Sequence, residues 1–511
     1  MNMMCLKIAI FSVETIHTIN LGGLSVHVSE LSSALAKYGH NVHVFTKDNN
    51  NGPSEFVVDN VTYHKCSYPK GNDTHEAYHF CVQAMNTFYA CEQKNKFCFD
   101  IIHAHDWSSF HVINMLKAHP AKKIVTAHST EYGRCGNKMH DGQSKVIRDV
   151  ECSGFHDADM SIFVSNGLAH EVSNIYNFKN NSKMRVIYNG VDLQKYDFDP
   201  NINVRALCNI PHDANIVLFV GRLTKQKGVD MLLDSVHDVV REHPNTYFVI
   251  VGDGFLRGEL EHKAHKNNVM KNVRFTGKLN NFSPLLKGLF KECTCLCVPS
   301  TNEPFGIVIL EAWCYKKPVV ATPCSGPLEI INNKINGYIA DMNSRSIGDN
   351  LRLLIRDGAK ARVMGENGYN DVRGLFSWEK IAAETLDVYT GGSKYVNMHK
   401  EKMAIMPDES IDKYIEYINN PVINYTSASR DTILVDSDVR SVTLKDKNVQ
   451  DTNIDRSEQN SYINSYTKTD DVDSPILSYR AVRRSNVKTP INADNAKIIE
   501  KLNKINFTLK H

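Results

Sequence analysis

The chain has 511 residues, of which 42% are hydrophobic and 23% charged, the proportions of an ordinary globular protein. Its net charge of only +2 lacks the basic excess of a dedicated nucleic-acid binder. No apolar run approaches the roughly 18 residues of a membrane span, and Ile8–Val13 is too short for a signal-peptide core, so we expect a cytoplasmic protein with no nucleic-acid partner and no transmembrane span. Peripheral contact with a membrane is left open.

The first part of the chain alternates between predicted strands and helices. Lys7–Val13 is a short apolar strand, and Ser25–Tyr38 follows as a helix with Gly39 at its C-terminal cap. Further buried strands are predicted at Asn41–Thr46, Asp100–Ala104 and Lys123–Ala127.

The same alternation starts again after Pro211. Strands are predicted at Asn215–Val220, Tyr247–Val251, Val273–Thr276 and Leu296–Pro299, and helices at Gly228–Glu242, from Phe305, from Gly326 and at Ser377–Tyr389. Strand–helix alternation is typical of parallel sheets covered by helices on both faces. We therefore predict an α/β fold of two Rossmann-like, doubly wound domains facing a cleft.

Composition divides the chain further. The domains are predicted at residues 1–200 and 201–376, with a helix over 377–391. Every cysteine lies at or before Cys324, and no phenylalanine occurs between Phe376 and Phe507. Residues 392–511 are therefore predicted to form a low-order tail, with a terminal helix suggested by the apolar stripe of Ile498, Leu502, Ile505 and Leu509.

The thirteen cysteines are an odd number without disulfide-like spacing, which favours free thiols. Cys293, Cys295 and Cys297 recur every two residues and so are predicted on one face of a strand, whereas metal knuckles usually space their ligands as Cys-x2-Cys. We therefore expect no metal site.

Gly22 and Gly23 follow the first predicted strand and open a helix. Paired glycines let the backbone approach a phosphate, and a helix N-terminus supplies amide donors; an ordinary tight loop is the alternative. The loop is not Gly-x-Gly-x-x-Gly, which counts against a dinucleotide-dependent dehydrogenase.

Arg222 and Lys227 bracket the loop after strand Asn215–Val220. A diphosphate there would meet two positive charges and a helix dipole. The alternative is two solvated cations at a loop rim, and the strand-end position favours the first interpretation.

Glu303-Pro304-Phe305-Gly306 begins a segment that ends at Glu311. With a helix from Phe305, Glu303 lies just outside the helix N-terminus and Glu311 about two turns on. Both carboxylates are then predicted toward one end of an element that faces the cleft. An N-cap glutamate with an unrelated surface glutamate is the alternative.

Several motifs occur in one order along residues 5–390. They are Gly22-Gly23-Leu24, His105-Asp106-Trp107, the stretch Thr126–Glu131, Val186–Asp192, Gly221-Arg222-Leu223 with Lys227-Gly228, and Glu303–Glu311. Together they resemble retaining glycosyltransferases of family four and the related glycogen and starch synthases. The resemblance implies a GT-B fold, with the N-terminal domain on the acceptor side, the C-terminal domain binding the nucleotide sugar, and helix Ser377–Tyr389 crossing back to the first domain.

The resemblance also assigns residues. Gly22, Gly23, Arg222, Lys227, Phe305, Gly306 and Glu311 match donor-binding positions, the two cations on the diphosphate and Glu311 on the ribose hydroxyls. Glu303 would face the transferred sugar, His128 would contact it, and Asp106 would lie near the acceptor. These three match catalytic positions.

The function implied is transfer of a hexosyl group, with retention, from a nucleotide sugar of the UDP- or ADP-glucose type to a glycan or glycolipid acceptor, possibly as in glycogen synthases. No metal or organic cofactor is expected. Asn20 stands where the bacterial and plant synthases carry lysine, which weakens the match to an ADP-glucose-dependent synthase. A GT-B sugar-nucleotide epimerase and a non-catalytic carbohydrate-binding protein are the alternatives.

Overall fold

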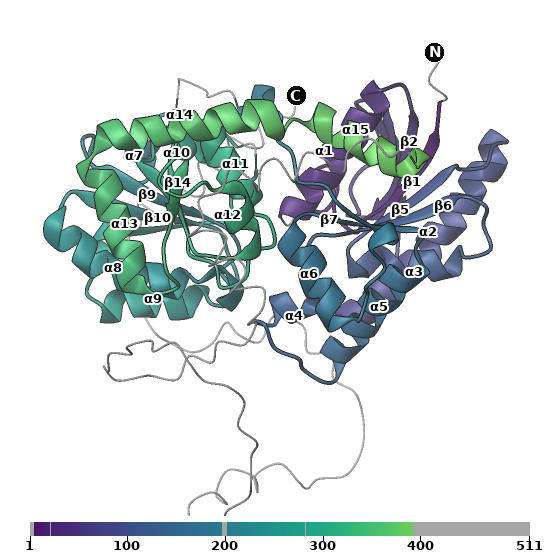
Figure 1. The fold of residues 1–511 in the computed structure, drawn as a ribbon, viewed down its shortest axis with the longest axis horizontal. Coiled ribbons are helices and arrows are strands. Elements are labelled where there is room, and N and C mark those ends of the chain that lie inside the picture. The colour runs from purple at the N-terminus through teal and green to yellow at the C-terminus, as the bar shows by residue number, and fades with distance from the viewer. Residues whose placement is uncertain (1–4, 21, 197–201, 282, 392–511) are drawn as a thin grey trace, which may run out of the picture. The chain divides into compact units, whose positions relative to one another are not determined.

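The computed structural model describes residues 5–20, 22–196, 202–281 and 283–391. These residues form two parallel-sheet α/β units (Figure 1), which confirms the predicted fold class. The predicted tail and its terminal helix lie outside the described residues.

The first sheet has eight strands in the order β3-β4-β2-β1-β5-β6-β7-β8. Neighbouring strands run parallel except β3 and β4, which form an antiparallel pair at one edge. The strands are β1 (Lys7–Phe11), β2 (Asn41–Lys47), β3 (Glu55–Val58), β4 (Val61–Cys66), β5 (Ile101–His105), β6 (Lys122–Ala127), β7 (Met160–Phe163) and β8 (Met184–Val186).

Strands β2, β3 and β4 follow one another without a helix, and helices connect the other strands, as is usual for parallel pairs. The helices are α1 (Gly23–Lys37), α2 (Asp73–Asn95), α3 (Trp107–Met115), α4 (Glu131–Arg134), α5 (Gln143–Asp157) and α6 (Asn166–Ile175), followed by the 3-10 turns η1 (Asn181–Lys183) and η2 (Leu193–Tyr196). Gly39, with φ of 87°, follows the C-terminus of α1 in the left-handed conformation, as the sequence predicts.

The second sheet has six parallel strands in the order β11-β10-β9-β12-β13-β14. They are β9 (Asn215–Val220), β10 (Thr246–Val251), β11 (Val273–Gly277), β12 (Cys295–Val298), β13 (Val319–Ala321) and β14 (Gly337–Ile339). The helices and 3-10 turns of this part are α7 (Val204–Leu207), η3 (Lys225–Lys227), α8 (Val229–Glu242), α9 (Arg257–Lys266), η4 (Met270–Asn272), α10 (Pro284–Glu292), α11 (Ile307–Cys314), α12 (Ser325–Ile330), α13 (Ser344–Arg356) and α14 (Gly358–Leu375).

The last described helix, α15 (Trp378–Thr390), belongs to the core of the first sheet. Trp378, Ile381 and Tyr389 are buried in the same cluster as Ile8 and Leu31. Ser377 caps its N-terminus by accepting a hydrogen bond from the amide of Lys380. Figure 1 shows α15 beside α1, after the long α14 that lies against the second unit.

Two element boundaries differ from the predictions. The first strand ends at Phe11 rather than Val13, because the apolar run is longer than the strand, and the helix predicted from Phe305 begins at Ile307. Cys293 lies before β12, as the C-terminal cap of α10, so the three cysteines do not share one strand. All three are nevertheless buried, and all thirteen thiols are free.

Among the described residues, no helix combines the length and hydropathy needed to cross a bilayer.

Candidate active site

Each sheet has one point where the strand order reverses direction. In the first sheet β1 lies between β2 and β5, and in the second β9 lies between β10 and β12. Ligands of open parallel sheets bind outside the carboxyl ends of the strands at such a point. The predicted site residues all follow β1, β5, β6, β9 or β12, so both sheets present them at these ends.

The loop after β9 carries the two predicted phosphate-binding cations. Arg222 is exposed, and Lys227 ends the 3-10 turn η3. Gly228 follows with φ of 61°, and a Cβ built there would lie 1.9 Å from the carbonyl oxygen of Pro299. Only glycine permits this close approach, which holds the β9 loop against the end of β12.

Glu303 is buried and paired. Its Oε2 accepts a hydrogen bond from Lys227 Nζ at 2.6 Å and one from Ser300 Oγ at 3.2 Å. Lys227 and Glu303 come from neighbouring strand ends, 76 residues apart. The pairing joins the predicted diphosphate cation to the predicted sugar-facing carboxylate.

Phe305 and Gly306 are held directly before helix α11. Gly306 has φ of 94°, which favours glycine, and it caps α11. A Cβ on Gly326 of α12 would lie 2.2 Å from Phe305 Cα. Because the first amides of a helix have no partner within it, the start of α11 is a set of donors beside Glu303.

Glu311 lies just over one turn into α11 rather than two, because the helix begins later than predicted. Its Oε1 accepts a hydrogen bond of 3.0 Å from the hydroxyl of Tyr196, at the end of η2. Burial raises the pKa of Glu311 to about 7, and the Tyr196 hydrogen bond opposes that rise. The two glutamates of this segment therefore have separate partners.

The paired glycines lie at the start of α1. A Cβ on Gly22 would meet no heavy atom within 4 Å, and one on Gly23 would lie 3.1 Å from Ile307 Cδ1, at the start of α11. The backbone at Gly22 is therefore open to a close ligand. Lys278, beyond β11, donates to the carbonyl of Asn20 at 2.7 Å, so a cation reaches the loop position where the synthases have lysine.

Asp106 follows β5 with φ of 58°, a positive value that is uncommon for a residue other than glycine. Its Oδ1 accepts a hydrogen bond of 2.7 Å from the backbone amide of His128. Burial raises the pKa of Asp106, and the positive charges of Arg134 and Arg222 oppose that rise. Asp106 therefore orients His128 and responds to the charge of the β9 loop.

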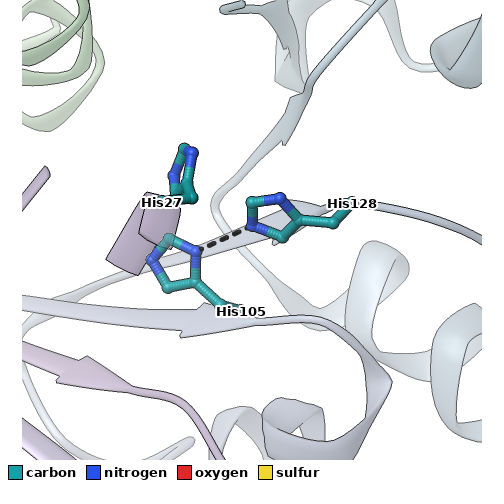
Figure 2. A group of neighbouring side chains, drawn as sticks. All are labelled: His27, His105 and His128. Carbon is teal, nitrogen blue, oxygen red and sulfur yellow. Dashed lines mark hydrogen bonds between the residues drawn. The ribbon is translucent and has the colours of Figure 1, made fainter. Parts of the chain in front are cut away.

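His128 lies in a cluster of histidines. The sequence analysis predicted His128 as a site residue but did not predict the cluster. Figure 2 shows His27 of α1 beside the rings of His105 and His128, which are joined by a hydrogen bond of 3.2 Å between His105 Nδ1 and His128 Nε2. His27 and His128 have ring centroids 4.4 Å apart, and His27 Nδ1 lies 2.6 Å from Asn189 Oδ1. Four segments of the chain thus meet at one place.

Burial keeps these rings uncharged. It lowers the pKa of His128 to about 3 and also lowers the pKa values of His27 and His105. A neutral imidazole offers one donor and one acceptor nitrogen. His128 is therefore suited to hydrogen bonding and packing and is not an acid at neutral pH.

Two side-chain clusters of the described residues have donor atoms near enough to share a metal ion: His27, His105 and His128, and, outside this site, His43, His64 and Cys91. In the first, the Nε2 atoms of His27 and His105 have no hydrogen-bond partner. His105 turns that nitrogen away from His128 and directs Nδ1 toward it (Figure 2), so Nδ1 is the His105 nitrogen that could share an ion with the other two rings.

A cavity of about 360 Å³ is lined by Asp73, Trp107, Glu131, Arg134, Gln143, Ser144 and Ile147. Trp107, one of its lining residues, directly follows Asp106 in the sequence.

Glu329 of α12 accepts hydrogen bonds from the amides of Asn166 and Gly167 at the start of α6, at 2.9 and 2.7 Å. A carboxylate at a helix N-terminus is favourable, but a pair 163 residues apart leaves no signal in the sequence.

Comparison with known proteins shows the family of the chain. Residues 21–195 match the family described as Glycosyltransferase Family 4, and residues 203–371 match Glycosyl transferases group 1. An uncharacterised glycosyltransferase of Methanocaldococcus jannaschii is 33% identical over 389 residues, which cover 72% of this chain and 94% of the relative. The chain belongs to these glycosyltransferases, and its predicted family is confirmed.

Two further proteins are similar over the same part of the chain. A glycogen synthase of Mycobacterium tuberculosis is 26% identical over 406 residues, 76% of this chain and 95% of the relative. The structure of HepE from Anabaena in complex with UDP and glucose has a TM-score of 0.60 at 18% identity, covering 76% of this chain and all of that one. The latter similarity concerns the fold, which is GT-B.

Proposed function

We propose that this glycosyltransferase moves a hexosyl group, with retention of configuration, from a nucleoside diphosphate sugar of the UDP- or ADP-glucose type to a glycan or glycolipid acceptor. The observation that carries the proposal is the pair of Lys227 and Glu303 at the switch point of the second sheet, 2.6 Å apart. The pair sets a diphosphate-binding cation beside a carboxylate that can hold sugar hydroxyls.

The donor lies along the ends of β9 and β12. Its diphosphate carries about two negative charges, which Arg222 and Lys227 match. Gly22 leaves open space for the phosphates beside the start of α1. Glu311, when ionised, accepts the ribose hydroxyls, and Tyr196 holds its other oxygen. UDP bound to the GT-B protein HepE supports a uridine nucleotide, and the name of the glycogen synthase relative supports a glucosyl donor.

The sugar lies between Glu303 and His128. Glu303 and the amides of Phe305 and Gly306 hold its hydroxyls, and neutral His128, positioned by Asp106, contacts its other side. The C–O bond to the diphosphate breaks while Arg222, Lys227 and the helix N-terminus stabilise the charge on the leaving oxygen. The acceptor attacks from the face that the leaving group occupied, which preserves the configuration, and its proton passes to the departing phosphate.

The acceptor occupies the cavity lined by Trp107 and Glu131. Trp107 offers an aromatic face for a sugar ring, and Asp73, Glu131 and Gln143 offer acceptors and an amide donor for its hydroxyls. This lining suits an uncharged glycan end, either free or attached to a lipid. Trp107 directly follows Asp106, which accepts a hydrogen bond from the His128 amide, so an acceptor held at Trp107 brings its attacking hydroxyl toward the transferred sugar in this proposal.

The test uses purified full-length protein with a panel of nucleotide sugars, each with and without maltooligosaccharide or glycolipid acceptors. Released nucleotide and thermal shift report donor use. We expect one donor to give acceptor-dependent nucleotide release and an α-linked product. Free isomerised sugar without transfer would identify an epimerase, and binding without nucleotide release a carbohydrate-binding protein. Either result would contradict the proposal.

A matched pair of variants separates the acceptor site from the donor site. Trp107→Ala should raise the KM for the acceptor several-fold and leave the KM for the donor unchanged. Glu311→Gln should raise the KM for the donor and leave the KM for the acceptor unchanged. Equal effects of both variants on both substrates would contradict the assignment of the cavity.

A further inference from the structure

A second histidine cluster lies outside the candidate active site. His43 of β2 and His64 of β4 lie on adjacent strands, and Cys91 lies on α2, which covers them. All three side chains are buried. Neither the family motifs nor the donor and acceptor assignments use any of these residues.

The three donor atoms lie close together in every pair. His43 Nδ1 is 2.9 Å from His64 Nε2, and Cys91 Sγ is 3.6 Å from the former and 3.9 Å from the latter. Histidine nitrogen and cysteine thiolate are the ligands that zinc prefers, with bonds of about 2.05 Å and 2.3 Å. With those bond lengths, the three separations correspond to angles at the metal of about 90°, 112° and 127°, which bracket the tetrahedral angle.

We propose that His43, His64 and Cys91 form a binding site for one divalent cation of the zinc type, linking two strands of the first sheet to α2. The proposal does not rest on the proposed transferase function. A three-ligand set of this kind leaves the fourth tetrahedral position to a water molecule.

Groups around the cluster support its ligands. His64 Nδ1, the nitrogen turned away from the cluster, lies 3.4 Å from Glu55 Oε2, on the strand paired with β4. A carboxylate on the far nitrogen fixes the tautomer that leaves Nε2 free to coordinate, and it raises the basicity of that nitrogen. Asn95 Nδ2 lies 3.4 Å from Cys91 Sγ, where it can donate to a thiolate.

The protonation states also suit a metal. Burial lowers the pKa values of His43 and His64 to about 4, so both rings are neutral and can act as ligands at physiological pH. Burial raises the pKa of Cys91, so binding at neutral pH must displace the thiol proton. The hydrogen shared between His43 Nδ1 and His64 Nε2 moves to His43 Nε2 as the metal takes its place. One proton is therefore released for each ion bound.

The experiment titrates the full-length chain, stripped of metal with a chelator and dialysed, with Zn²⁺ and separately with Co²⁺. We expect about one equivalent of either ion to bind, with a rise in melting temperature. A thiolate-to-cobalt charge-transfer band should appear. Cys91→Ala should abolish the band, and His64→Gln should remove stoichiometric binding.

Two further variants keep the test sharp. Cys81→Ala removes another buried thiol of α2, whose Sγ faces the Ser108 carbonyl instead, and should leave metal binding unchanged. Glu55→Gln changes a half-exposed side chain, so it should fold normally, and it should weaken Zn²⁺ binding about 10- to 100-fold without altering nucleotide-sugar turnover.

No uptake by the wild-type chain, or equal uptake by the wild type, Cys91→Ala and His64→Gln, would overturn the proposal. The latter result would place the ion elsewhere, for example at His27, His105 and His128. An unchanged affinity in Glu55→Gln would also contradict the orienting role of that carboxylate. None of these outcomes depends on whether the protein transfers a sugar.

Discussion

The two sheets carry different polar groups at their carboxyl ends. The second sheet presents charge, with the ion pair of Lys227 and Glu303 and the exposed Arg222. The first presents neutral imidazoles, those of His27 and His105, which are buried, and that of His128, which is partly buried. Charged diphosphates interact strongly with the former, whereas uncharged hydroxyls need only the hydrogen bonds of the latter. This difference predicts that substitutions of the charged residues will weaken the use of the donor. It also predicts that protonation of the histidines will lower the stability of the first sheet.

The largest expected effect tests the charged end. Charge-assisted hydrogen bonds contribute about 1.5–3 kcal/mol each, so Arg222→Ala and Lys227→Ala should each lower kcat/KM for the donor by about 10- to 150-fold. Lys225→Ala, on the same loop and also exposed, is the matched control and should stay near wild type. If both variants remained within twofold, the donor site would be wrongly assigned.

The second effect tests the neutral end through stability. Native His103 and His128 have pKa values near 3 because they are buried, whereas unfolded histidines have pKa values of about 6.5. As the pH falls below about 6.5, the unfolded chain therefore takes up protons that the native state does not, and stability is lost. Each such histidine contributes about 1.4 kcal/mol per pH unit over that window.

Urea unfolding between pH 7 and pH 5 measures this dependence. His105→Gln removes one buried ring whose pKa is lowered by burial, so it should flatten the pH dependence by one histidine's share. His262→Gln on α9, an exposed residue, should not alter it. A stability independent of pH in this range would contradict the neutral histidine cluster.

The third effect is a shift in pH profile. Ionised Glu311 accepts the ribose hydroxyls in our proposal, so donor affinity should rise as pH increases through about 7, where burial has placed the pKa of this carboxyl group. Tyr196→Phe removes a hydrogen bond that favours the carboxylate, so the pKa should rise further. With about 0.5–1.5 kcal/mol for such a bond, the midpoint should move upward by about 0.4–1 pH unit.

Donor binding by the wild type and Tyr196→Phe, measured from pH 6 to pH 9, provides the test. The two proteins should differ near pH 7 and converge at pH 9, where both carboxylates are ionised. An unchanged midpoint would show that Tyr196 does not influence the pKa of Glu311.

Added Mg²⁺ should leave the turnover of both proteins unchanged, because two side-chain cations already neutralise the diphosphate.

Sequence reasoning predicted the fold because buried parallel strands are short apolar runs separated by helical periods. It placed Gly22, Arg222 and Glu303 after strands for the same reason, since strand ends are local features. It could not predict that Glu311 meets Tyr196, 115 residues away, nor that His27 joins His128. Such contacts depend on strand order within a sheet and on loop conformation, which periodicity does not encode.

The smallest expected effect concerns residues beyond α15. Among the described residues, two polar contacts hold the end of this helix: His103 Nδ1 is 2.7 Å from the hydroxyl of Tyr389, and Lys122 Nζ donates to the carbonyl of Val388 at 2.6 Å. Gly391, with φ of 79°, caps the helix. A chain ending at Gly392 should therefore keep its turnover, and its melting temperature should stay within about 4 °C of that of the full chain. In small domains, a loss of about 1 kcal/mol in stability lowers the melting temperature by more than this.

The control for this truncation is a chain ending at Phe376, which removes α15 altogether. It exposes the side chains that Trp378, Ile381 and Tyr389 cover in the core of the first sheet. Burying one such large apolar residue contributes about 1.5–3 kcal/mol, so the shorter chain should be insoluble or unfolded. If the chain ending at Gly392 failed in the same way, α15 would need residues beyond Gly392, and the first sheet would not be complete within the described residues.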